Sequence, residues 1–127
     1  MSKIKNTLQQ IEQTLLSFGY PVFYGRSFIG SNDKFNYFVF NRQQITRSGK
    51  TNNDFTLYYQ VHIIMEDYIP EGFELDVIDA IQENTKLKLT NNSMSYQYTT
   101  KGSTDIVVEL LTITFALPLK RCNLKGE

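Results

Sequence analysis

The stretch from Asp54 to Glu66 alternates apolar and polar side chains and constrains the fold more than any other part of the chain. A side-chain period of two is typical of a β-strand that packs against a core through one side only. The apolar side carries Phe55, Leu57, Tyr59, Val61, Ile63 and Met65, and the other side carries Thr56, Tyr58, Gln60, His62, Ile64 and Glu66.

At ~3.4 Å per residue this strand would be about 44 Å long, well beyond the usual five or six residues. Such a length indicates a central strand. A sheet with only one face buried is more often antiparallel than parallel.

Two other segments carry apolar residues at helical spacing. The first predicts a helix from about Ser2 to Phe18, ended by Gly19 as a left-handed C-cap and by Pro21. The second predicts a helix that begins near Pro70 and ends near Asn84. The two apolar stripes are Ile4, Leu8, Ile11, Leu15 and Phe18, and Phe73, Val77, Ile78 and Ile81.

Shorter patterns predict strands at residues 21–24, 37–40, 93–100 and 105–117, whereas the polar, basic residues 41–52 predict a long loop. The element order is therefore α-β-β-β-α-β-β. We expect an α+β domain with a mostly antiparallel sheet of about five strands and two helices packed on one face.

A chain of 127 residues is near the modal size of one domain, so we expect a single domain over residues 1–121 and a short C-terminal tail over 122–127. No apolar run approaches the ~20 residues that span a bilayer, and the first ten residues lack the apolar core of a signal peptide. We expect no membrane partner and synthesis in a cytosol. The lone Cys122 can build neither a disulfide framework nor a structural zinc site.

Charge is balanced overall but unevenly distributed. The chain has 13 basic and 13 acidic residues, which argues against a general polyanion binder. Residues 51–85 contain eight acidic residues and no Lys or Arg, while the flanking segments are basic. This segregation suits either head-to-tail contact between copies of the chain or a solvated acidic helix with partners inside the same chain.

The sequence carries no motif that predicts catalysis. It has no Gly-rich phosphate loop, and His62 is the only imidazole, in the middle of a strand. The carboxylates of the second helix are typical of its solvated face. We expect no enzyme activity, no metal and no cofactor. Tyr58, Tyr96 and Tyr98 could stack unpaired bases, or they could pack across strands or in a protein interface. Residues 51–85 contain no Lys or Arg to bind phosphate groups, which favours packing over base stacking.

The chain resembles the tail-terminator or tail-completion (neck) proteins of long-tailed bacteriophages. The resemblance covers roughly residues 1–121 and rests on the order of elements and on degenerate strand patterns. Its parts are the amphipathic first helix, Gly-Tyr-Pro-Val-Phe-Tyr-Gly (19–25), Phe-Asn-Tyr-Phe-Val-Phe (35–40), a polar loop, Tyr-Tyr-Gln-Val-His-Ile-Ile (58–64), an acidic helix and Thr-Ile-Thr-Phe-Ala-Leu-Pro (112–118).

The resemblance implies a structural protein of the virion that forms a ring, typically a hexamer, on the head-proximal end of the tail tube. Such a ring stops tube polymerisation and joins the head, so the implied partners are the chain itself, the tube protein, the head–tail connector and the passing genomic DNA. Assembly would take place in the host cytoplasm.

By analogy, Arg42, Arg47 and Lys50 would contact the tube protein or the genome. Contacts between subunits would involve the second sheet face and the acidic helix, through Tyr58, His62, Ile64, Tyr98, Glu74, Asp76 and Asp79. Two alternatives stay open: an adjacent head–tail connector or neck protein, and a small cytosolic module that binds single-stranded nucleic acid or protein.

Overall fold

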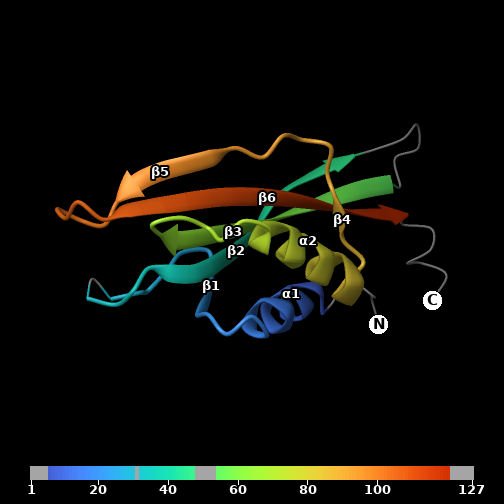
Figure 1. Cartoon of the computed structure of the whole chain (residues 1–127). Coiled ribbons are helices and arrows are strands. Elements are labelled where there is room, and N and C mark those ends of the chain that lie inside the picture. The colour runs from blue at the N-terminus through green and yellow to red at the C-terminus, as the bar shows by residue number, and fades with distance from the viewer. Residues whose placement is uncertain (1–5, 31, 48–53, 121–127) are drawn as a thin grey trace.

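The computed structural model describes residues 6–30, 32–47 and 54–120, which form an α+β fold with a six-stranded mixed sheet and two helices (Figure 1). The elements are α1 (Thr7–Leu16), β1 (Val22–Tyr24), β2 (Asn36–Arg47), β3 (Asp54–Glu66), α2 (Phe73–Asn84), β4 (Lys88–Leu89), β5 (Tyr96–Thr100) and β6 (Val107–Lys120). This confirms the fold class predicted from the sequence.

The strand order is β1-β2-β3-β6-β4, and β5 also pairs with β6. Only β1 and β2 run parallel among the strand pairs of the described residues, so the sheet is mostly antiparallel as expected. The sequence did not predict β4, because a strand of two residues has no detectable period.

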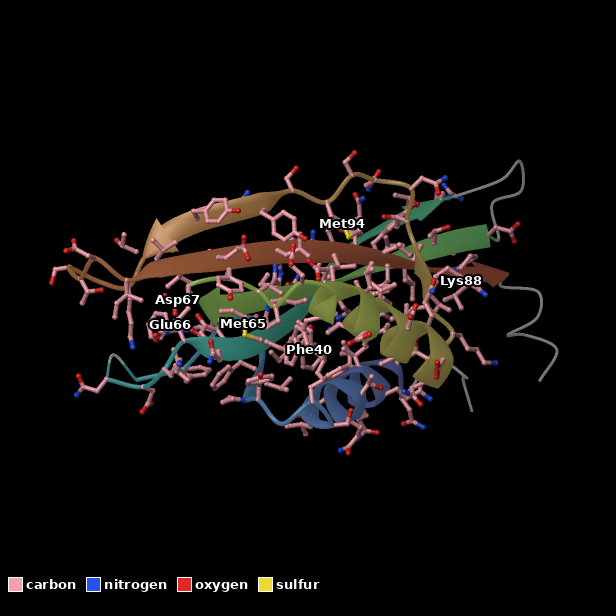
Figure 2. All side chains as sticks on the ribbon, viewed as in Figure 1. Phe40, Met65, Glu66, Asp67, Lys88 and Met94 are labelled. Atoms are coloured by element: carbon pink, nitrogen blue, oxygen red, sulfur yellow. The ribbon has the colours of Figure 1, made fainter. Side chains whose placement is uncertain are left out.

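The stretch from Asp54 to Glu66 forms β3 with the predicted bounds, at the centre of the sheet. It pairs along its length with β2 on one side and with β6 on the other. Its predicted apolar side faces both helices, and Figure 2 shows Phe40 and Met65 between the sheet and the helices. The fully buried members of this core include Ile11, Leu15, Phe38, Val61, Ile63, Val77, Ile81, Ile113 and Phe115.

An aromatic cluster joins the end of α1 to β2 and to the start of α2. The ring of Phe73 lies 5.4 Å from Phe18 and 5.9 Å from Tyr20, and stacks on Phe38 at 6.0 Å between centroids. Gly19 has a φ of +90°, the left-handed conformation predicted for it, and this turn brings Tyr20 back over the sheet. The cluster therefore fixes where both helices sit.

The prediction of a loop over residues 41–52 is wrong for residues 41–47, which belong to β2. β2 continues to Arg47 and pairs with β3 through Arg47↔Phe55, with a bulge at Gln43 that shifts the register between Arg42 and Gln44. The sequence did not indicate this strand, because residues 42–45 are exposed beyond the helix-covered core and so show no alternation of apolar and polar side chains. Backbone hydrogen bonds to β3, which leave no trace in the side-chain pattern, hold the segment in the sheet.

A second, smaller cluster covers one end of the other sheet face. It is formed by the buried residues Tyr37, Val39, Ile64 and Val108, with Phe23, Ile29, Phe35 and Leu110 packed against them. The ring of Tyr37 lies 5.8 Å from Phe23 and 5.9 Å from Phe35. Side chains from the segment between β1 and β2 thus form part of a core that the sequence analysis did not predict.

β6 begins two residues later than predicted, at Val107, and continues three residues further, through Pro118 to Lys120. Pro118 lies beyond the residues of β6 that β4 pairs with, in keeping with the preference of proline for unpaired strand edges. Within the described ranges, neither helix has the length and apolar character needed to cross a bilayer.

Candidate functional site

The sheet face turned away from the helices carries a patch of uncharged side chains, here named the neutral face. Residues directly opposite each other on paired strands share a side, so the register defines the patch. It comprises Asn41, Gln44, Tyr58, Gln60, His62, Thr112, Thr114 and Ala116 on β2, β3 and β6. Each of these side chains keeps part of its surface exposed. At its border on β4, the exposed Lys88 pairs with Ala116 and lies on the same side. Partly exposed, uncharged positions on adjacent strands are typical of the centre of a protein–protein interface, where charged residues are depleted.

His62 links the three strands of the neutral face. Its Nε2 lies 2.6 Å from Asn41 Oδ1 and its Nδ1 lies 2.8 Å from Thr112 Oγ1. Because the amide oxygen of Asn41 can only accept, Nε2 carries the hydrogen and Nδ1 accepts from the Thr112 hydroxyl. Burial lowers the pKa of His62 below its ordinary value, so the ring stays neutral at pH 7 and adds no charge to the face.

Two predicted interface residues do not lie on the exposed part of this face. Ile64 points to the same side as His62 but is only 5% exposed, within the second cluster. Burial within the subunit thus accounts for its apolar character. Tyr98 pairs with Glu109, which pairs with Met65, so Tyr98 lies on the side of the sheet that the helices cover. The expectation that Tyr98 shares a face with Tyr58, His62 and Ile64 was therefore wrong.

The predicted basic residues lie on a strand rather than in a loop. Arg42 is exposed, and its Nε donates to the Tyr24 hydroxyl at 3.3 Å, a bond that raises the pKa of the guanidinium. Arg47 is the last residue of β2 and pairs with Phe55, on the same side of the sheet as Arg42. Lys50 lies outside the described residues. Neither described arginine belongs to the neutral face.

The acidic residues predicted for the interface lie on α2. Glu74 and Asp76 are in its first turn, where negative charge favours the helix dipole, and Asp76 and Asp79 are exposed. A carboxylate oxygen of Glu74 accepts a hydrogen bond from the Tyr96 hydroxyl on β5. This bond raises the pKa of Tyr96 to about 12. Glu74 therefore already has a partner inside the chain, while Asp76 and Asp79 face solvent.

Glu109 is a buried carboxylate that the sequence analysis did not single out. It is 8% exposed and accepts two hydrogen bonds, from the Ile69 backbone N–H at 2.6 Å and from the Tyr98 hydroxyl at 2.7 Å. The second bond raises the pKa of Tyr98. A signal was present in the sequence, because Glu109 occupies an inward position of an alternation that continues with Leu111, Ile113 and Phe115.

The polar groups of this region are engaged in hydrogen bonds within the fold. Both ring nitrogens of His62 are engaged within the sheet. In the part of the chain that the structure describes, no three His, Cys, Asp or Glu residues come together as metal ligands would. Tyr58 lies on the opposite side of the sheet from Tyr96 and Tyr98, so these tyrosines do not form one stacking platform. No protein-family model matches the sequence, and no curated protein matches it.

Proposed function

We propose that this chain is a structural subunit that assembles into a ring, of the kind that ends the tail tube of a long-tailed bacteriophage and offers a surface for joining the head. The neutral face is the observation that carries the proposal. It extends over β2, β3 and β6 and contains no charged side chain at neutral pH, while the exposed Lys88 of β4 borders it beside Ala116. A ring subunit needs such a surface, because each copy must bury part of itself against the next.

The arrangement of charges supports contact between unlike surfaces of neighbouring copies. Asp76 and Asp79 are exposed on α2, and Arg42 is exposed on β2. A ring requires a heterologous contact, in which one patch meets a different patch, and complementary charge fixes the register of that contact. The same geometry opposes a nucleic-acid module, because the phenols of Tyr96 and Tyr98 bind carboxylates that would repel phosphate groups.

The proposal is tested by placing one charge on the neutral face. Gln60→Lys puts an ammonium group at its centre, and Gln9→Lys makes the same change at an exposed position of α1. We expect the wild type and Gln9→Lys to form rings, visible by electron microscopy and by light scattering. We expect Gln60→Lys to stay monomeric at the same concentration, because a buried unpaired charge opposes association.

Melting temperatures close to the wild-type value would show that both variants fold. The proposal fails if Gln60→Lys assembles as the wild type does, or if the wild type stays monomeric both alone and with tube protein. In a phage that carries the gene, loss of the chain should give tubes of uncontrolled length. Normal tubes that merely fail to join heads would indicate an adjacent neck protein instead.

A further inference from the structure

A hollow of about 480 Å³ lies between β5, the start of α2 and the segment that connects β3 to α2. It is distinct from the neutral face, because its sheet residues belong to the helix-covered side. Three tyrosines and three glutamates line it: Tyr68, Tyr96, Tyr98, Glu71, Glu74 and Glu109. Aromatic rings and carboxylates are the two kinds of group that attract an organic cation.

The carboxylates of this hollow have only neutral partners. Glu109 accepts from a backbone N–H and a phenol, and Glu74 accepts from the phenol of Tyr96. The one ion pair between residues of the described ranges joins Lys101 to Glu66, so no described Lys or Arg neutralises these groups. The hollow therefore carries negative charge that no side chain of the described residues balances.

One carboxylate oxygen in the hollow is buried and has no partner. Glu74 Oε1 is inaccessible to solvent and makes no hydrogen bond, whereas its other oxygen binds Tyr96. A buried acceptor without a donor destabilises the protein, and such groups are rare in folded proteins. Within the described residues this oxygen has no donor, so it adds to the uncompensated negative charge at the wall of the hollow.

The tyrosines supply the remaining part of a cation site. The side chains of Tyr68 and Tyr98 are 66% and 64% exposed, so an incoming group can reach their rings. The hydroxyls of Tyr96 and Tyr98 are held by Glu74 and Glu109, which fixes both rings in place before anything binds. Fixed rings lose little conformational entropy on binding, and their faces attract cations.

We propose that this hollow binds the cationic side chain of an arginine or lysine presented by a neighbouring subunit. The charged group lies beside the carboxylate of Glu74, and the alkyl chain lies against the tyrosine rings. The source of the cation rests on the proposed function, since the chain has as many basic as acidic residues but concentrates its acids in residues 51–85. A second copy therefore carries the complementary charge.

The test titrates the full chain with N-acetylarginine amide, with N-acetyllysine amide and with the citrulline analogue, which is nearly isosteric with arginine but neutral. Nuclear magnetic resonance reports the shifts of the Tyr96 and Tyr98 signals. We expect saturable binding of the two cations and none of the citrulline compound. Glu74→Gln should lower the affinity about tenfold, because the cation loses a negatively charged neighbour in a partly buried site. Asp79→Asn, which removes the same charge from an exposed position of the same helix, should change it less than about twofold.

Equal losses in Glu74→Gln and Asp79→Asn, or equal binding of the citrulline compound, would overturn the proposed site. Its failure is separate from that of the proposed function. A wild type that forms rings but binds neither cation refutes the hollow and leaves the ring. A wild type that binds the cations but never assembles refutes the ring and the neighbouring subunit as the source.

Discussion

Replacing Ile64 by Ala tests whether the second cluster is part of the subunit core or a contact between subunits. Ile64 is 5% exposed and packs with Tyr37, Val39 and Val108. The substitution removes three carbon atoms, which corresponds to about 2.4 kcal/mol of transfer free energy at ~0.8 kcal/mol each. The residual cavity adds to this, so we expect a loss of about 2.5–3.5 kcal/mol in the free energy of unfolding.

Ile45→Ala is a matched control for this change. Ile45 lies on β2 and is 65% exposed, so the same atoms are removed from a strand without removing them from a core. We expect less than about 0.5 kcal/mol from this control. The difference between the two variants isolates burial, because both lose the same strand-favouring side chain.

The assay is urea unfolding followed by circular dichroism, at a protein concentration at which light scattering shows a monomer. Concentration matters because association would itself stabilise the folded subunit. For a domain of this size the expected loss lowers the melting temperature by on the order of 10 °C. If both variants unfold at the same urea concentration, and Ile64→Ala instead reduces assembly, the assignment of Ile64 to the subunit core is refuted.

Three further predictions concern protonation. Absorbance titration should show a pKa of about 12 for the phenol of Tyr96, and Glu74→Gln should lower that pKa toward the ordinary 10.0. Because the pKa is raised in the folded state, the bond stabilises the fold below pH 10. This stabilisation is lost as the pH rises toward 12. In a proton nuclear magnetic resonance titration, the pKa of His62 should lie below its ordinary value of 6.5. The free energy of unfolding should fall as the pH drops through that lowered pKa. A pKa of 6.5 would contradict the buried, neutral ring. The hydrogen bond from Lys101 lowers the pKa of Glu66, so Lys101→Met should be less stable than the wild type above pH 4.5. The difference in stability should vanish in acid, where Glu66 is protonated. A difference that persists in acid would show that the ion pair does not cause the loss of stability.

The central strand could be predicted from the sequence because its physical cause is local. Each residue of β3 lies between two paired strands, with one side chain toward the core and the next away from it. The alternation of Phe55 to Met65 records that environment directly. The two helices were predictable for the same reason, since each presents a single apolar stripe to the sheet.

The second half of β2 could not be predicted in this way. Arg42, Gln43, Gln44 and Ile45 are all exposed, so no core imposed a pattern on them. What makes this segment a strand is the neighbouring strand β3, which extends far enough to pair with it. Pairing is a tertiary effect that overrides weak local preference.

The prediction that Tyr98 shares a sheet face with Tyr58 and His62 was wrong, because it depended on the register between strands that are distant in sequence. Alternation within residues 93–100 predicts that Tyr96 and Tyr98 share a side, which they do. It does not say which side, because a shift of one residue exchanges the two faces. The hydrogen bond from Tyr96 to Glu74 places Tyr96 beside α2. Tyr98 bonds to Glu109 of β6 on the same helix-covered side, away from His62.

The outer edge of β2 has a consequence for solubility. β1 pairs with β2 only as far as Phe40, so from Asn41 to Thr46 one side of the strand has no partner strand within the described residues. Open edges recruit other chains and lead to aggregation. The bulge at Gln43 breaks the regular spacing of the backbone groups, and Arg42 adds a positive charge beside it. These irregularities protect the chain against uncontrolled extension of its sheet by other chains.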